Sequence, residues 1–278
     1  MTFVAPGGLR LLGSIGAGST FEVAVVEHPR GPCVCKRLKL RMLDEPAGQG
    51  AMQRETELLG AVRHPAVPEL IGAGNDDRGP YVLQTRLEAL SVRALVEGYA
   101  ERGEPMPQPM MTALLRAAFQ ALAELHDYRA DSRSLALVHG DIGPDHLLVG
   151  KGRVYFIDFG QARWQGMTVA VSSGERGTLP YVCPEVARGD QESDQAADVF
   201  ALAATFAYAA LGRDPCRAEG AAARLVELAE RGLDLAALDT SPSLTARTHR
   251  ALLRALALDR SDRATEASAV LALLGGLA

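Results

Sequence analysis

Hydrophobic and polar residues follow two different spacings along the chain. In the first ninety residues, short apolar or alternating segments end at Gly, Pro or charged turns, which predicts strands at 9–16, 21–28, 32–39 and within 80–90. One segment among them, 51–62, has its apolar residues near helical spacing. From about Ser91 the chain is rich in Ala and Leu, and its spacing predicts helices at 110–126, 198–211, 221–232 and 248–259. We therefore expect a small, strand-rich part followed by a larger helical part.

Composition narrows the class of protein without changing this picture. Of the 278 residues, 47% are hydrophobic and 23% charged, which is ordinary for a globular protein. The net charge of −5, without a long run of one sign, argues against a nucleic-acid surface. The four cysteines have neither the number nor the spacing of a disulfide framework or a zinc site, so a cytoplasmic location is expected. We expect no export peptide and no membrane span, because no basic leader and no sufficiently long apolar run is present.

Candidate chemistry begins in the strand-rich part. The stretch GSIGAGSTFEV is a Gly-rich turn between two strands, in which Gly16 and Gly18 would let backbone amides approach phosphate oxygens closely. A Gly-rich hairpin is also a common tight turn, so this motif alone does not decide. Lys36 follows in the next strand and Glu55 in the following helix. A strand lysine directed at phosphates needs an anion to hold it, which this glutamate can supply; a pair of solvated charges is the alternative.

A second group of polar residues lies in the helical part. The run LVHGDIGPDHLLV places Asp141 and His146 between apolar segments, and Asp158 follows the apolar strand VYFI. Two aspartates at the ends of short apolar segments can place one carboxylate near a metal and the other near an attacking hydroxyl. Three further charged residues are candidates for buried positions: Glu185, Asp198 and Arg263.

In this order and spacing, the motifs resemble those of the eukaryotic-type Ser/Thr protein kinases, which also occur in bacteria. The resemblance covers nearly the whole chain and rests on the Gly-rich turn, VCK, the helix glutamate before RHP, HGD, DFG and GTLPYVCPE. It implies an α+β, bilobal protein-kinase-like fold, with a small antiparallel β-sheet lobe and one main helix in residues 1–86. Residues 87–278 would form the larger, mostly α-helical lobe. The resemblance also implies ATP and either Mg²⁺ or Mn²⁺, and the Ala- and Arg-rich composition fits a bacterial member.

The resemblance implies a role for each matching residue. Asp141 would orient the substrate hydroxyl and accept its proton, while Asp158, together with His146, would bind the metal. Lys36 would hold the α- and β-phosphates of ATP and be positioned by Glu55. The other residues expected around ATP are Gly16 and Gly18 over the phosphates, Val23, Val34 and Leu148 against the adenine, Gln84 at the back of the pocket, and Leu87 in the hinge. Two structural roles are also implied: His139 as a core histidine anchored on Asp198, and an ion pair of Glu185 with Arg263.

Four positions depart from the family's usual pattern. Gly140 replaces the arginine that receives a phosphorylated activation loop, and Gly143 replaces a lysine that stabilises the transferring phosphate. His146 replaces the asparagine that holds a second metal ion. Either its neutral imidazole binds a metal, which suits Mn²⁺ better than Mg²⁺, or it merely hydrogen-bonds a nearby backbone carbonyl. Phe21 stands where the phosphate loop has its third glycine, so it would either cover or obstruct the phosphates. Together these changes predict a rate lower by about 10²–10⁴.

Three functions stay open on these residues. An active Ser/Thr protein kinase is favoured by the retained lysine, glutamate and two aspartates, and Thr178 supports Ser/Thr over Tyr as acceptor. A pseudokinase, which binds nucleotide or partners as a scaffold or switch, is favoured by Gly143 and His146. The third is a small-molecule phosphotransferase of the aminoglycoside kinase type, which often carries HGD but has no counterpart of the segment around Glu185.

The expected partner is a protein substrate or a signalling protein, and the sequence indicates no oligomeric state. Residues 161–176 would form the activation loop. Thr168, Ser172 and Ser173 are its possible phosphorylation sites, although exposed hydroxyl groups are common and the usual arginine receiver is absent.

Overall fold

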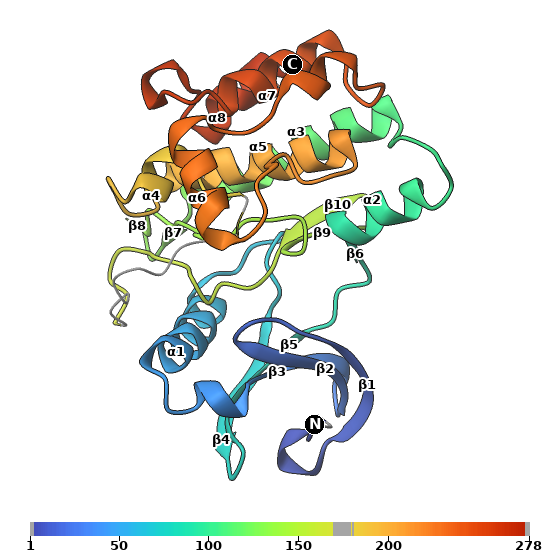
Figure 1. Cartoon of the computed structure of the whole chain (residues 1–278). Helices are drawn as coiled ribbons and strands as arrows, with labels where there is room; N and C mark the ends of the chain where they lie inside the picture. The colour runs from blue at the N-terminus through green and yellow to red at the C-terminus, as the bar shows by residue number, and fades with distance from the viewer. Residues whose placement is uncertain (1–2, 169–178, 180, 276–278) are drawn as a thin grey trace. The chain divides into compact units, whose positions relative to one another are not determined.

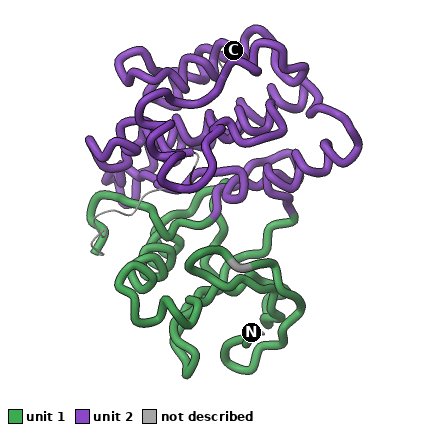
Figure 2. The backbone as a smooth tube through the Cα atoms, in the orientation of Figure 1, with its two compact units in different colours: residues 1–88, 158–175 green, residues 89–157, 176–278 purple. Residues whose placement is uncertain are grey.

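The computed structural model describes residues 3–168, 179 and 181–275. The chain divides into two compact units (Figure 2). Unit 1 consists of residues 1–88 and 158–175, and unit 2 of residues 89–157 and 176–278. The chain therefore returns to unit 1 at Asp158, which joins this aspartate to the unit that holds Lys36. The lobe boundary expected between residues 86 and 87 remains a prediction.

Unit 1 is built on a five-stranded antiparallel sheet with the strand order β1-β2-β3-β5-β4 (Figure 1). Its strands are β1 (Arg10–Ala17), β2 (Phe21–His28), β3 (Gly31–Leu38), β4 (Leu70–Asp76) and β5 (Gly79–Thr85). The strands predicted from the hydrophobic pattern are confirmed, with small shifts at their ends. The sequence did not predict β4, because LIGAGND contains two glycines and one β-branched residue and so has little strand propensity.

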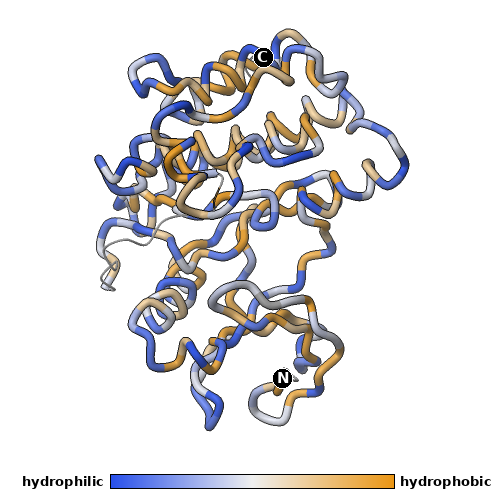
Figure 3. Tube along the Cα trace, viewed as in Figure 1, coloured by the Kyte–Doolittle hydropathy of each residue, from blue (hydrophilic) through white to orange (hydrophobic). Residues whose placement is uncertain are grey.

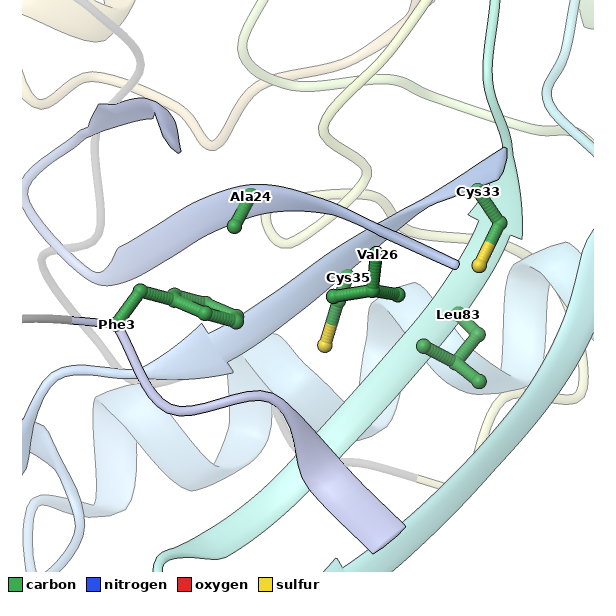
Figure 4. Close-up of a cluster of buried hydrophobic side chains, with 6 residues drawn as sticks. All are labelled: Phe3, Ala24, Val26, Cys33, Cys35 and Leu83. Carbon is green, nitrogen blue, oxygen red and sulfur yellow. The ribbon is translucent and has the colours of Figure 1, made fainter. Parts of the chain in front are cut away.

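The two faces of this sheet have different coverings. Residues opposite each other in antiparallel strands point to the same face, and the register pairs Val23 with Lys36 and Val34 with Gln84. Strand alternation therefore places these four side chains on one face. The other face is buried with the help of the N-terminal segment (Figure 4), in a cluster of Phe3, Ala24, Val26, Cys33, Cys35 and Leu83.

Helix α1 (Pro46–Ala61) packs on the face that carries Lys36, as the contact of its Glu55 with this lysine shows. The helix predicted at 51–62 is confirmed, and it begins five residues earlier, at Pro46. Proline suits this first position because its fixed φ is helical and its missing N–H would have no helical partner there. Two short 3-10 helices, Pro6–Gly8 and Leu40–Met42, complete the regular structure described for unit 1.

Unit 2 is mostly helical, as expected (Figure 1). Its helices are α2 (Val92–Ala100), α3 (Gln108–His126), α4 (Pro184–Arg188), α5 (Gln195–Leu211), α6 (Ala221–Glu230), α7 (Ala246–Ala255) and α8 (Ala267–Leu273). Its short elements are β6 (Leu90–Ser91), β7 (Arg129–Ala130), β8 (Arg133–Ser134), β9 (Leu147–Gly150), β10 (Arg153–Phe156), and the 3-10 helices Ala236–Thr240 and Arg260–Asp262. The four helices predicted in this part, and the α+β class, are confirmed.

Helix α5 forms the centre of unit 2. It is hydrophobic along most of its length (Figure 3), nearly all of its residues are buried, and it packs against α3 and α7. Asp194 caps its first turn by accepting a hydrogen bond from the amide of Ala197, and Gly212 ends it in the left-handed conformation. This rigid helix carries Asp198 near its start. Within the described ranges, we find no helix with the length and apolar character needed to cross a membrane.

Candidate active site

Lys36 is held inside unit 1 by two carboxylates. Its Nζ donates to Oε1 of Glu55 at 2.6 Å and lies 3.6 Å from Oδ1 of Asp158. Only 3% of the lysine is exposed, and Glu55 is fully buried. Burial alone would lower the pKa of Lys36, but the attraction of Asp158 and Glu55 is stronger and raises this pKa above its ordinary value. Lys36 therefore remains a cation at neutral pH, directed along the sheet face that also carries Val23, Val34 and Gln84.

Asp158 has a backbone conformation that is unusual for a residue with a side chain. Its φ is +68°, in the left-handed region, which aspartate tolerates better than most residues. Contacts of the next two residues hold this conformation: the amide of Phe159 donates to Oε2 of Glu55, and Nε of Arg54 donates to the carbonyl oxygen of Gly160 at 2.6 Å. The Asp158 side chain keeps 28% of its surface exposed, so this carboxylate fits the oxygen ligand that a divalent cation requires.

The other predicted phosphate and adenine residues of unit 1 lie in or next to its sheet. Gly16 is in β1 and Gly18 in the turn before β2, and a Cβ at either position would meet no atom within 4 Å. Gln84 is buried in β5, and its Oε1 has no hydrogen-bond partner in the part of the chain that the structure describes. Leu87 lies in the half-buried connector that follows β5. Their roles in binding ATP remain predictions.

In unit 2, hydrogen bonds to the carboxylate of Asp198 hold the loop that carries Asp141. The two carboxylate oxygens of Asp198 accept hydrogen bonds from the amides of His139, at 2.7 Å, and Gly140, at 2.9 Å. His139 is buried, and its Nε2 lies 3.2 Å from the carbonyl oxygen of Ile157, which confirms the expectation of a core histidine. Gly140 has a φ of +78°, a conformation in which an arginine would be strained. The backbone around Asp141 is therefore rigid.

His146 turns back toward the same loop. Its Nδ1 lies 2.7 Å from the backbone carbonyl oxygen of Asp141 and 3.4 Å from Oδ2 of the same residue. A carbonyl oxygen can only accept, so Nδ1 carries the ring proton and Nε2 carries the lone pair of the neutral ring. Leu148 follows in β9 and is half-buried. The structure therefore brings Asp141 and His146 together, and any ligand atom of His146 is Nε2.

The expected ion pair of Glu185 and Arg263 is present in the core of unit 2. Two parallel hydrogen bonds join the guanidinium to the carboxylate, at 2.7 and 2.9 Å. Burial alone would raise the pKa of Glu185, but the hydrogen bonds from Arg263 outweigh it and lower this pKa. The pair connects α4 to the chain before α8, which supports the structural role expected for it.

Two contacts of the loop regions had no clear signal in the sequence. Arg54 is fully buried and reaches Gly160, although its neighbours in QRETE suggest an exposed helical face. Nε of Arg93 lies 2.9 Å from both carboxylate oxygens of Asp145, in the loop after Asp141. Finding either pair requires the fold, because each joins residues far apart in the chain.

The possible phosphorylation sites lie only partly in the described chain. Ser172 and Ser173 fall outside the described residues, and so does Thr178, which was expected to favour a Ser/Thr acceptor. Thr168 is exposed, and its hydroxyl donates to Oε1 of Glu57 on α1 at 2.5 Å. A phosphate on Thr168 would therefore meet a carboxylate in this conformation.

Comparison with known proteins identifies the family. The protein kinase domain family matches residues 9–272. The probable serine/threonine-protein kinase PkwA of Thermomonospora curvata is 30% identical over 215 residues, which cover 77% of this chain and 27% of that protein. The serine/threonine-protein kinase PknD of Mycobacterium tuberculosis is 27% identical over 213 residues, or 76% of this chain and 30% of the relative. The tyrosine-protein kinase MasK of Myxococcus xanthus is 27% identical over 239 residues, which cover 85% of this chain and 37% of that protein.

The chain thus spans well under half the length of these three relatives. The family match is not confined to one motif, because it extends from the strand before the Gly-rich turn to the last helix. The matched range includes the buried Lys36–Glu55 pair and the loop fixed by Asp198. The chain therefore belongs to the protein kinase family.

Proposed function

We propose that this chain transfers the γ-phosphate of ATP to the hydroxyl groups of serine or threonine in a protein substrate, with a weakened or Mn²⁺-preferring metal site. One observation carries the proposal: Lys36, Glu55 and Asp158 form a buried, connected cluster in unit 1. A buried cation whose neighbouring carboxylate remains partly exposed matches a polyphosphate and its metal ion in charge.

In this proposal unit 1 supplies the groups that bind ATP. Lys36 holds the α- and β-phosphates, and Glu55 keeps its ammonium in place. Gly16 and Gly18 let the backbone come close to phosphate oxygens. Asp158 holds the divalent ion, which neutralises charge on the phosphates when it is bound.

Unit 2 supplies the group that handles the proton. Asp141 accepts a hydrogen bond from the substrate hydroxyl, aligns its oxygen with the γ-phosphorus and takes the proton as the new O–P bond forms. The bond from that phosphorus to the β–γ bridging oxygen breaks, and ADP is the leaving group. The hydrogen bonds from His139 and Gly140 to Asp198 support this function because they hold the loop rigid before substrate binds.

The proposed preference for Mn²⁺ over Mg²⁺ depends on His146. Its Nδ1 donates to the Asp141 carbonyl oxygen, so a metal ion held by this ring would be bound through Nε2. A nitrogen ligand is poor for Mg²⁺ and better for Mn²⁺. The same observation favours a second candidate, a pseudokinase that binds nucleotide with one metal ion on Asp158 and serves as a scaffold or switch.

The partner in either case is a protein, a substrate for the kinase or a signalling partner for the pseudokinase. We propose a cytoplasmic location because all four cysteines are free and buried, which suits a reducing compartment.

The test measures phosphate transfer and nucleotide binding on the same samples. Wild type, Asp141→Asn and the surface control Asp190→Asn are incubated with labelled ATP, Mg²⁺ or Mn²⁺, and a general protein substrate. Thermal stability is recorded with ATP alone and with each metal. Incorporation that disappears in Asp141→Asn, persists in Asp190→Asn and is found on serine or threonine would support the proposal.

The other outcomes separate the two candidates. A metal-dependent rise in Tm without incorporation in any metal would favour the pseudokinase. Label on a small molecule, or on tyrosine alone, would contradict the proposed acceptor. The absence of both incorporation and any shift in Tm would contradict nucleotide binding.

A further inference from the structure

Phe21 occupies the position where a phosphate-binding loop of this pattern has its third glycine. It is the first residue of β2 and pairs with Leu38 of β3 in the sheet register. Its side chain is buried, with 5% exposed. The ring packs against Gly160, since a Cβ on that glycine would lie 3.4 Å from Cε2 of Phe21. The aromatic ring is therefore turned into unit 1 and away from solvent.

The same ring lies over the ammonium group of Lys36. Nζ of Lys36 is 5.5 Å from the ring centroid of Phe21, within the range of a cation–π contact. The other neighbours of this ammonium are Glu55, at 2.6 Å, and Asp158, at 3.6 Å. With 3% of its surface exposed, Lys36 has two carboxylates and one aromatic ring around its charge. Among the described residues, the Phe21 ring is thus one of the groups that bury this ammonium, so a phosphate oxygen can reach it only if its neighbours move.

A glycine at position 21 would not have this effect. Gly16 and Gly18 have nothing within 4 Å of the position that a Cβ would take, so the phosphate loop is open at its two glycines. The cover over Lys36 comes from the side chain that replaces the third one. Its attraction to Lys36 grows as the contact loses water, so the covered state is favoured when no ligand is present.

We propose that Phe21 sets the affinity of this protein for nucleotide by covering Lys36, and that the ring must leave the lysine before a phosphate can bind. This inference rests on the proposed function, because it assumes that Lys36 is the phosphate-binding lysine. The apparent dissociation constant equals the intrinsic one divided by the fraction of uncovered molecules. With about 1–10% of molecules uncovered, we expect nucleotide binding about 10–100-fold weaker than in an uncovered protein.

The first test measures the cover without nucleotide. The chain has three lysines, Lys36, Lys39 and Lys151, so acylation by an amine-reactive ester can be followed at each by mass spectrometry. We expect Lys36 in Phe21→Ala to react at least about 10-fold faster than in wild type, with Lys39 and Lys151 as internal references. Phe3→Ala is the matched control, because it removes a buried phenyl ring from the opposite face of the same sheet. An unchanged Lys36 rate in Phe21→Ala, with native circular dichroism, would overturn the proposal.

The second test measures nucleotide. Phe21→Ala is expected to lower KM and Kd for ATP about 10-fold or more at unchanged kcat. Phe21→Leu keeps an apolar cover without the ring, so it should lower both constants less. A higher KM in Phe21→Ala would mean that the ring assists phosphate binding and would sink the idea. If Lys36 reacts faster in Phe21→Ala but neither wild type nor the variants bind nucleotide, the proposed function is refuted. The conclusion that Phe21 covers Lys36 would still hold.

Discussion

Gly143 and His146 lie in the loop that starts at Asp141, and in the proposed function each would alter one electrostatic contribution to phosphate transfer. The first removes a cation that would offset charge on the moving phosphate, and the second exchanges an oxygen ligand for a nitrogen. Neither change disturbs the loop, which is anchored through the backbone amides of His139 and Gly140. Substitutions at these two positions therefore keep this anchor of the loop, although those at His146 also remove its hydrogen bond to the Asp141 carbonyl.

His146→Asn is expected to change the metal preference. Asparagine offers an amide oxygen, which suits Mg²⁺, in place of the imidazole nitrogen. The ratio of the initial rate in Mg²⁺ to that in Mn²⁺ should rise about 10-fold or more relative to wild type. His146→Ala is the control, because it removes the nitrogen without supplying an oxygen and should leave Mg²⁺ activity low. An unchanged ratio in His146→Asn would show that position 146 is not a metal ligand.

Gly143→Lys is expected to restore the missing cation. Among the described residues, a Cβ at this glycine would meet the ring of Tyr181, at 3.5 Å, which is an ordinary contact, so the backbone can accept a side chain. We expect kcat to rise about 10–100-fold with little change in KM for ATP, since the charge acts on the transition state. Gly143→Gln, of similar length and without charge, should give little increase. Equal effects of the two substitutions would refute the electrostatic explanation.

The sequence predicted two buried ion pairs, one in the candidate site and one in the core of unit 2. The contacts of Lys36 with Glu55 and of Glu185 with Arg263 are present, and His139 is buried. The partner of a charged residue that matches a family motif can be predicted because a buried charge needs an opposite charge beside it. The cover of Lys36 by Phe21 was left open, since a side chain's direction depends on packing that the sequence does not display.

At the scale of elements, hydrophobic spacing predicted the helices and strands whose apolar residues are regular. It did not predict β4, with its two glycines, or the short helices α4 and α8, which offer too few turns for a pattern. It also placed the start of α1 too late, because PAGQG has few apolar residues although proline begins the helix. Tertiary contacts decide these elements, so their propensities alone do not.

The joint between α4 and the chain before α8 depends on one buried ion pair. Removing one partner leaves an uncompensated buried charge, so we expect Arg263→Ala to lower the free energy of unfolding by about 3–5 kcal/mol. Arg260 also contacts Glu185, at 3.2 Å, but is 38% exposed, so Arg260→Ala should cost less than about 1 kcal/mol. Urea unfolding measures both. Equal costs would contradict the assignment of the joint to Arg263.

The Glu185–Arg263 pair should also make the free energy of unfolding depend on pH, with opposite signs for the contribution of Glu185 in wild type and in Arg263→Met. Glu185 has its pKa below the ordinary 4.5, so its contribution to wild-type stability is full above that value and is lost as the pH falls through the lowered pKa. In Arg263→Met the carboxyl group stays buried and only the part-exposed Arg260 is left beside it, so the effect of burial dominates and its pKa rises above the ordinary value. That variant should therefore lose less stability than wild type between about pH 6 and 4, which urea midpoints across this range would measure. Parallel profiles would contradict the coupling.

At the scale of the whole molecule, the chain forms two units, and it enters the first one twice. The segment from Asp158 joins unit 1 because Phe159 and Gly160 bond to Glu55 and Arg54 of α1. Sequence patterns report periodicity within a segment, so they do not show that a segment near residue 160 completes a sheet domain that begins near residue 10. The family resemblance placed Asp158 beside Lys36 in function, and the hydrogen bonds of α1 supply the physical reason.

The four buried cysteines make the stability of the two units separately measurable. Cys33 and Cys35 lie in the sheet core of unit 1, and Cys183 and Cys216 in unit 2. Burial raises the pKa of Cys35 and Cys183 to about 12 and that of Cys216 to about 11, so these thiols are inert in the folded protein. Each pair reacts only when its own unit opens.

We expect Cys33 and Cys35 to be alkylated at lower urea concentration than Cys183 and Cys216. Unit 1 is the smaller unit, and one helix covers its sheet on the Lys36 face, whereas unit 2 is organised around the deeply buried α5. Pulsed alkylation followed by mass spectrometry of the four cysteine peptides resolves the order, with fully unfolded protein as the reference for intrinsic reactivity. Alkylation of all four at one urea concentration would mean that the units unfold together, and earlier alkylation of Cys183 and Cys216 would reverse the expected order. If ATP and metal bind through Lys36 and Asp158, adding them should move the Cys33 and Cys35 transition to higher urea, because a ligand that binds only the folded unit stabilises it.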